Sequence, residues 1–225
     1  MAKEHIYSST DLPQRTAQVV AAKMIQAIAA RGRCYCALSG GSSPEPMLQA
    51  LADQTLPWEK VVLLMVDERL TDDANAQNQT MLNRFIERIP GSKPQLITLF
   101  ENEPPDKACI MANHKVSDCP TQLDIIVLGM GMDGHTASLF PDANEFQTAM
   151  GCKDRYVTVM PTEAPYQRLS MSFHWIAQAS ELLLYIPGAD KLHCFHSITS
   201  SADSISPINT LNAQCPQLSV YSSKD

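Results

Sequence analysis

Short, uninterrupted runs of apolar residues are the feature of this sequence that most constrains its fold. The run at residues 61–66 reads Val-Val-Leu-Leu-Met-Val, and similar runs occupy residues 125–128 and 182–186. Strands that are buried on both faces of a parallel sheet have this composition. Amphipathic segments of helical length separate the runs, so we expect βαβ units with right-handed connections.

The other elements follow from turn and cap residues. Residues 8–11 offer N-caps for a long first helix that ends at about residue 30, and Pro44 is placed as the first residue of a second helix. Predicted parallel strands cover residues 33–38, 61–66, 94–100, 125–128, 182–186 and 218–221. Further helices are predicted at 78–89 and 104–116, up to about 198, and after 207.

These elements predict an α/β fold with a Rossmann-like, mostly parallel sheet flanked by helices. Residues 156–159 and 168–173 alternate more between polar and apolar, which predicts a smaller antiparallel portion in the C-terminal third. No repeat, low-complexity tract or linker divides the chain. We therefore expect a single domain that spans residues 1–225.

Composition excludes several classes of function. The net charge of −7 argues against a nucleic-acid binder, because neutralising phosphates requires a basic face. Seven cysteines without a Cys-x-x-Cys pair predict free thiols rather than disulfides or a zinc site. The start of the chain has no apolar leader, and no stretch is long enough to span a membrane. We expect a cytoplasmic protein, monomeric or weakly dimeric, with a small-molecule partner only.

The sharpest chemical signal is the glycine-rich segment at residues 129–141, Gly-Met-Gly-Met-Asp-Gly-His-Thr-Ala-Ser-Leu-Phe-Pro. It follows a predicted strand, and ligands bind beyond the carboxyl ends of strands in open α/β sheets. Within it, Asp133 and His135 lie two residues apart. A histidine can take a proton from water while a carboxylate fixes its tautomer. A single loop histidine is more often structural, but this setting favours catalysis.

A second loop, at residues 39–43, lies between a predicted strand and a predicted helix. Ser39, Gly40, Gly41 and Ser42 would present backbone N–H groups and hydroxyls to an anion beside the helix start. It is not a Walker loop, because no Gly-Lys-Ser/Thr follows. An ordinary Gly/Ser turn is an equally good interpretation of this loop taken by itself.

Charged residues complete the set of candidates. Asp67, Glu68 and Arg69 directly follow an apolar run, where a cleft position is expected for Asp67 and a solvated loop remains open for Glu68. Arg69 either pairs with Asp67 or meets a substrate phosphate. Arg168 and Lys191 stand near element boundaries, and a surface position is the default for both.

Taken together, these motifs resemble the 6-phosphogluconolactonase family, which is related to the glucosamine-6-phosphate isomerase/deaminases. The resemblance rests on Ser39-Gly40-Gly41-Ser42-Ser43-Pro44, Asp67-Glu68-Arg69, residues 129–141, Arg168 and Gly188-Ala189-Asp190-Lys191, and it covers nearly the whole chain. The deaminases continue after Asp-Gly-His to an Asn-Glu-Pro ending with a further catalytic carboxylate. Here the continuation is Ser138-Leu139-Phe140-Pro141, without an acid, which favours the lactonase.

The resemblance implies hydrolysis of 6-phospho-D-glucono-1,5-lactone to 6-phospho-D-gluconate, the second step of the pentose phosphate pathway. It implies phosphate binding by residues 39–43 with Arg69, Arg168 and Lys191, and catalysis by His135, Asp133 and Asp67. No metal and no organic cofactor is implied. Two alternatives are an isomerase or deaminase of amino sugar phosphates and a non-catalytic sugar-phosphate sensor.

Overall fold

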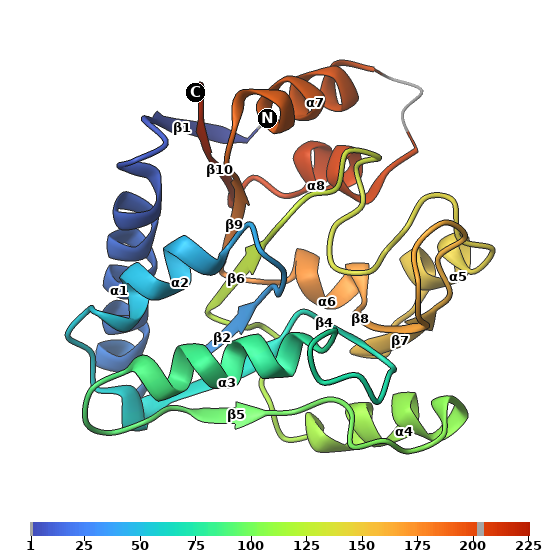
Figure 1. Cartoon of the computed structure of the whole chain (residues 1–225), viewed down its shortest axis with the longest axis horizontal. Coiled ribbons are helices and arrows are strands. Elements are labelled where there is room, and N and C mark those ends of the chain that lie inside the picture. Colours follow the sequence, from blue (N-terminus) through green and yellow to red (C-terminus); the bar gives the residue numbers. More distant parts are fainter. Residues whose placement is uncertain (1, 202–204) are drawn as a thin grey trace.

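A parallel sheet with helices on both sides forms the body of the molecule (Figure 1). The structure is a computed structural model that describes residues 2–201 and 205–225. The strands are β1 (Lys3–Tyr7), β2 (Cys34–Leu38), β3 (Val61–Met65), β4 (Asp67–Arg69), β5 (Gln95–Ile97), β6 (Ile125–Leu128), β7 (Tyr156–Val159), β8 (Arg168–Met171), β9 (Glu181–Ile186) and β10 (Leu218–Ser223). The helices are α1 (Leu12–Arg31), α2 (Glu45–Ala52), the 3₁₀ helix η1 (Trp58–Lys60), α3 (Asn78–Arg88), α4 (Pro105–Lys115), α5 (Phe146–Gly151), α6 (Phe173–Ala177), α7 (Ala189–Ser200) and α8 (Pro207–Gln214).

In the described part of the chain, seven strands pair in the order β1-β10-β9-β6-β2-β3-β5, and every pairing is parallel. Strands β3 and β6 are buried along their whole length, as a sheet covered on both faces requires. In Figure 1, α1 and α2 lie to the left of the central strands, and α6 and α8 lie to the right. The mostly parallel sheet expected from the sequence is confirmed.

The antiparallel portion differs from the prediction in one respect. A separate sheet has the order β4-β8-β7 among the described residues. Strands β7 and β8 lie in the C-terminal third, as expected, but β4 is formed by residues 67–69, which were expected only to follow a strand. The segment is too short to carry a recognisable period, so only its long-range pairing with β8 reveals it as a strand.

Smaller differences concern element ends and short elements. Helix α1 ends at Arg31, close to the predicted end at about residue 30, and its C-cap Gly32 adopts φ +77° and donates its N–H to the carbonyl of Ile28. Pro44 is the N-cap of α2 rather than its first residue. Strand β1 and the short helices α5 and α6 were not predicted, because each covers too few residues to show a period.

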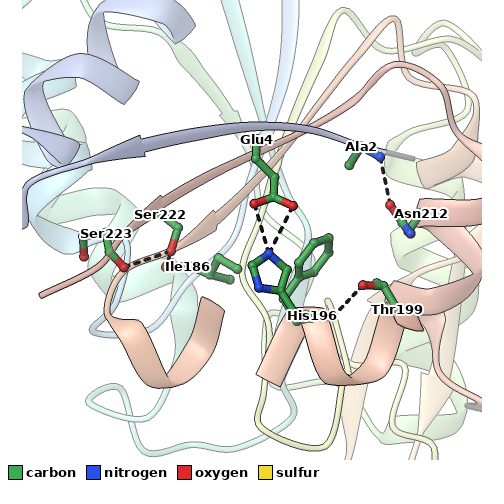
Figure 2. Close-up of polar contacts among 9 residues, drawn as sticks. Ala2, Glu4, Ile186, His196, Thr199, Asn212, Ser222 and Ser223 are labelled. Carbon is green, nitrogen blue, oxygen red and sulfur yellow. Dashed lines mark hydrogen bonds and ion pairs between the residues drawn. The ribbon is translucent and has the colours of Figure 1, made fainter. Parts of the chain in front are cut away.

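The first strand is held at the sheet edge by side chains of the last helices (Figure 2). Both carboxylate oxygens of Glu4 lie 3.0–3.1 Å from Nε2 of His196 on α7, and the amide of Ala2 donates to Oδ1 of Asn212 at 2.9 Å. These contacts fix α7, whose first turn carries Lys191, against the sheet. No helix within the described residues has the length and apolar character needed to cross a membrane.

Candidate active site

The two loops singled out in the sequence meet where the strand order reverses. Strands β2 and β6 are neighbours, yet the chain leaves β2 toward β3 and β5 and returns to β6 on the opposite side. The loops that follow them are tied together, since the amide of Ser39 donates to the carbonyl of Val127 and the amide of Gly129 donates to Oγ of Ser39 at 3.3 Å. A ligand crevice is expected at such a point in an open α/β sheet.

A cavity of about 360 Å³ opens between these loops. Every site residue predicted from the sequence lines it except Asp133, which lies behind His135. The lining residues are Ser39, Gly40, Gly41, Ser42, Ser43, Pro44, Asp67, Arg69, Asn78, Gly129, Met130, Gly131, His135, Ala137, Ser138, Phe140, Ala164, Arg168 and Lys191. The volume suits a sugar phosphate better than a larger cofactor.

His135 and Asp133 form a close pair in the glycine-rich loop. Nδ1 of His135 lies 2.6 Å from Oδ1 of Asp133, which also accepts the His135 amide at 3.2 Å. Burial favours the neutral acid, but the hydrogen bonds and charge of His135 outweigh it and hold the pKa of Asp133 below its usual value. An ionised Asp133 accepts a proton-bearing Nδ1, which leaves Nε2 as the acceptor atom of the imidazole.

The surroundings of His135 restrict how its ring can lie. A side chain on Gly131 would meet Cε1 of the ring at 2.2 Å and Oδ1 of Asp133 at 2.5 Å, so only glycine is compatible with this pair. The ring of Phe140 lies on another side, with a centroid separation of 4.2 Å. The imidazole is therefore held between the loop backbone and an aromatic ring.

The 39–43 loop presents backbone donors to the cavity. Within the described residues, no hydrogen bond uses the amides of Gly40, Gly41, Ser42 or Ser43. Gly41 has φ +97°, a conformation that favours glycine. Gly40 has no room for a side chain, because a Cβ would lie 2.1 Å from Oδ1 of Asn78. The loop thus keeps its N–H groups available to an anion.

Two arginines lie side by side on neighbouring strands of the small sheet. Arg69 and Arg168 are direct partners in the antiparallel pairing of β4 with β8. Arg168 is buried, which is a correction to the surface position expected by default. Burial, reinforced by the charge of Arg69, lowers the pKa of Arg168. Two like charges in this arrangement are unfavourable unless an anion joins them.

Neither arginine forms an ion pair with a carboxylate in the described part of the chain. Nη1 of Arg69 donates to the carbonyl of Ala76 at 2.5 Å, while Arg168 donates to the carbonyls of Pro165 and Tyr166 at 3.0 and 3.3 Å. The guanidinium carbon of Arg168 also lies 5.8 Å from the centroid of the Phe140 ring. Both cations therefore keep a net positive charge beside the cavity.

Lys191 lines the same cavity from the first turn of α7. Its Nζ donates to Oγ of Ser43 at 3.1 Å, joining the start of α7 to the 39–43 loop. Burial lowers the pKa of Lys191. The surface position that was the default for this lysine is therefore corrected, because Lys191 is half-buried and lines the cavity.

Asp67 is bound by uncharged groups rather than by Arg69. Its Oδ2 accepts the hydroxyl of Ser138 at 2.7 Å, and its Oδ1 accepts Nδ2 of Asn78 at 3.2 Å. No ion pair joins Asp67 to Arg69 among the residues described. The side chain faces the cavity, as predicted, and is 8% exposed.

Glu68 is buried, so the solvated position left open for it is wrong. It is 1% exposed, and its carboxylate accepts the amides of Arg69 and Asn78 at 2.7 Å each and that of Gln79 at 2.8 Å. It thereby caps the N-terminus of α3. Burial raises the pKa of Glu68 to about 7, although these N–H groups favour the ionised form.

Sequence reasoning did not single out Asn78 or the hydroxyl of Ser138 as cavity residues. Asn78 was identified only as the start of a helix, and Ser138 only as a position without an acid. Their contacts span 11 and 71 residues along the chain, respectively, so no local pattern reveals them. No group of three or more His, Cys, Asp or Glu side chains in residues 2–201 and 205–225 is placed to hold a metal ion.

A second cavity, of about 550 Å³, adjoins the first between α2 and α3. Gly41, Ser42, Arg69 and Asn78 line both, so they form the wall between them. The larger cavity is lined by the apolar residues Leu48, Met81 and Phe85 and by three arginines, Arg69, Arg84 and Arg88, but no histidine lines it. The smaller cavity combines three cations with His135, so it is the one equipped for acid–base chemistry on an anion.

Comparison with known proteins agrees with this geometry. A model of the family described as "Glucosamine-6-phosphate isomerases/6-phosphogluconolactonase" matches residues 7–220. A 6-phosphogluconolactonase of Pseudomonas aeruginosa is 31% identical over 200 residues, covering 87% of this chain and 84% of the relative. One from Rhizobium meliloti is 32% identical over 207 residues, covering 90% and 89%.

Solved structures extend the similarity to the whole fold. The crystal structure of a 6-phosphogluconolactonase from Shewanella baltica superposes with a TM-score of 0.94 at 28% identity, covering 99% of this chain and 98% of that one. The resemblance found in the sequence is thereby confirmed. The chain belongs to the glucosamine-6-phosphate isomerase/6-phosphogluconolactonase family, within its 6-phosphogluconolactonase branch.

Proposed function

We propose that the cavity between residues 39–43 and 129–141 binds 6-phospho-D-glucono-1,5-lactone and that His135 is the general base for its hydrolysis. Hydrolysis of this lactone to 6-phospho-D-gluconate is the activity of the branch to which the chain belongs. The single observation that carries the mechanism is the Asp133–His135 pair, whose imidazole lines the same cavity as Arg69, Arg168 and Lys191.

The cations and the 39–43 loop would hold the phosphate. Unused amides and three positive side chains provide hydrogen bonds and charge for a dianion, and the fixed phosphate then orients the lactone ring. Binding the dianion also relieves the repulsion between Arg69 and Arg168. Asp67, held by Ser138 and Asn78, would accept a hydrogen bond from a hydroxyl of the ring.

Chemistry would begin at Nε2 of His135. This atom removes a proton from water as the water oxygen bonds to the lactone carbonyl carbon. Collapse of the tetrahedral intermediate breaks the bond between that carbon and the ring oxygen, and the imidazolium returns the proton to this oxygen. Asp133 fixes the tautomer and stabilises the imidazolium. The amide of Met130 would stabilise the oxyanion, because the neighbouring amides of Gly129 and Gly131 already donate to Ser39 and to the His135 carbonyl. The scheme uses no metal and no organic cofactor.

The test is hydrolysis of freshly generated phosphogluconolactone, corrected for spontaneous opening, by the wild-type chain and by His135→Ala. We expect hydrolysis by the wild type, and a kcat lower by roughly 10²–10⁴-fold in the variant, the usual contribution of a general base. A folded His135→Ala variant with wild-type kcat would contradict the mechanism. An inactive wild type would contradict the assignment of substrate.

We further propose that the protein works in the cytoplasm as a monomer or weak homodimer, with neither nucleic acid nor membrane as a partner. The net charge of −7 supports the absence of a nucleic-acid partner. Light scattering across a concentration series gives the mass of the species in solution. A stable tetramer would contradict this proposal.

A further inference from the structure

Asn78 occupies an unusual place in the wall of the site. It is the first residue of α3, it is 3% exposed, and it lines both cavities. Three separate parts of the site contact it. The backbone amide of Asn78 contacts Glu68, and its Nδ2 atom contacts Asp67. The rest of the Asn78 side chain packs against the backbone of Gly40.

The first contact fixes where Asn78 lies. Its amide donates to Oε1 of Glu68 at 2.7 Å, and the next amide, of Gln79, donates to Oε2 at 2.8 Å. The same Oε1 accepts the amide of Arg69. One buried carboxylate therefore joins the start of α3 to strand β4, which carries both Asp67 and Arg69.

The second contact fixes Asp67. Nδ2 of Asn78 donates to the backbone carbonyl of Asp67 at 3.0 Å and lies 3.2 Å from its Oδ1. The hydroxyl of Ser138 donates to the other carboxylate oxygen at 2.7 Å. With both oxygens held, the carboxylate has one rotamer relative to the cavity. An amide nitrogen is required here, because an oxygen in its place would face two acceptors.

The third contact supports the 39–43 loop. The Oδ1, Cγ and Cβ atoms of Asn78 lie 2.1, 2.2 and 2.7 Å from where a Cβ on Gly40 would stand. The asparagine side chain therefore packs directly against the Gly40 backbone. Removing it would leave a gap under the loop whose amides face the anion.

From these three contacts we infer that Asn78 is a positioning residue that fixes the position of Asp67 relative to the 39–43 loop. This inference rests on the proposed function, since it assigns Asp67 to the lactone ring and the loop to its phosphate. Asn78 itself acts through these two groups. The hydrogen bond to Asp67 and the packing against Gly40 use different atoms of the Asn78 side chain, so different substitutions can remove one contact without the other.

The experiment measures kcat and KM for phosphogluconolactone hydrolysis in a set of variants. N78D keeps the shape under Gly40 but places an oxygen against Asp67, so we expect kcat to fall at least about 10-fold with KM changed by less than about threefold. N78A loses both the hydrogen bond to Asp67 and most of the packing against Gly40, so kcat falls and KM rises. G40A places a methyl group against Asn78, so its main effect is a higher KM.

The double variant G40A/N78G provides the rescue, because alanine at position 78 would keep a Cβ only 2.7 Å from the new methyl group. With glycine at position 78, the methyl group introduced at position 40 occupies vacated space, so we expect KM to return toward the wild-type value. The hydrogen bond to Asp67 stays lost, so kcat stays low. A double variant that recovers kcat together with KM would overturn the hydrogen-bonding role.

N113A is the matched control for general destabilisation. Asn113 also joins a helix to a strand through its side chain, since Oδ1 accepts the amides of Arg155 and Tyr156 and Nδ2 donates to the Tyr156 carbonyl, but it lies outside the site cavity. We expect N113A to lose thermal stability and keep kcat. Wild-type kcat in N78D, or an equal kcat loss in an equally destabilised N113A, would overturn the inference. An inactive wild type would instead refute the proposed function. In that case, the affinity for 6-phosphogluconate, measured by calorimetry in the same variants, would still test whether Asn78 supports the phosphate-binding loop.

Discussion

Nδ1 of His135 and Oδ1 of Asp133 lie 2.6 Å apart, and the backbone of Gly131 passes so close to both that it has no room for a side chain. The pair is therefore set by the path of the loop as well as by its own hydrogen bond. Each of these two constraints leads to a separate prediction about the reaction.

The carboxylate of Asp133 is expected to act only through His135. In Asp133→Asn the amide nitrogen can donate to Nδ1, which moves the ring proton to Nε2 and removes the basic atom from the cavity. We expect kcat to fall by roughly 10²–10⁴-fold with little change in KM. Steady-state kinetics of Asp133→Asn, His135→Ala and the double variant test this. The double variant should be no slower than His135→Ala, because residues that act as a unit are not additive.

The loop path is tested by Gly131→Ala. The added methyl group meets the His135 ring and the Asp133 carboxylate, so the pair must separate, and we expect kcat to fall at least about 10-fold. Gly151→Ala is the control, because Gly151 has open space and an ordinary φ. A crystal structure of the Gly131→Ala variant should show a displaced imidazole. An undisturbed ring with wild-type kcat would contradict the packing argument.

Lys191 is expected to recognise the phosphate and not the reacting carbonyl. A hydrogen bond to a charged group contributes about 1.5–3 kcal/mol, so Lys191→Ala should raise KM by roughly 10–150-fold with kcat nearly unchanged. The sharp comparison uses glucono-1,5-lactone, which lacks the phosphate. With that substrate, Lys191→Ala and the wild type should differ little. The control is Lys107→Ala, which removes an exposed lysine of α4 and should match the wild type with either lactone. A large kcat loss on both lactones would place Lys191 at the reacting centre instead.

Glu68 gives the folded chain a pH-dependent stability. Its pKa is raised by burial from 4.5 to about 7, so the folded state binds more protons than the unfolded state between these pH values. The stability that this proton provides is fully present below pH 4.5 and is lost as the pH rises through 7. Such a shift corresponds to a few kcal/mol, on the order of 3.

Urea unfolding at several pH values measures this effect. We expect the difference in unfolding free energy between the wild type and Glu68→Gln to change progressively between pH 4.5 and 7, in favour of the wild type at the acid end. A difference that is flat across this range would show that the backbone amides of Arg69, Asn78 and Gln79 keep Glu68 ionised throughout.

The parallel sheet and the location of the site were accessible from the sequence because their signals are local. The run at residues 61–66 needs no partner to be recognised as a buried strand, and residues 129–141 place their glycines, acid and imidazole in one turn. The convergence of both loops follows from a general property of parallel sheets, in which strand ends meet at one edge.

The second layer of the site was not accessible, because its contacts are made between distant residues. Glu68 looks like a loop residue until β4 is seen to pair with β8, and Asn78 looks like an ordinary helix start until Asp67 and Gly40 lie against it. Arg168 was given a surface position by default for the same reason. Burial depends on what the rest of the chain places on top, and a single sequence does not carry that information locally.

The pairing of β1 with β10 has a consequence for how the sheet is completed. Lys3 aligns with Ser219 and Tyr7 with Ser223, so the first strand of the chain has the last one as its partner. During synthesis the residues of β1 leave the ribosome long before those of β10. A truncation that removes β10 therefore also leaves β1 without a partner strand, whereas one that removes β1 leaves β10 paired with β9.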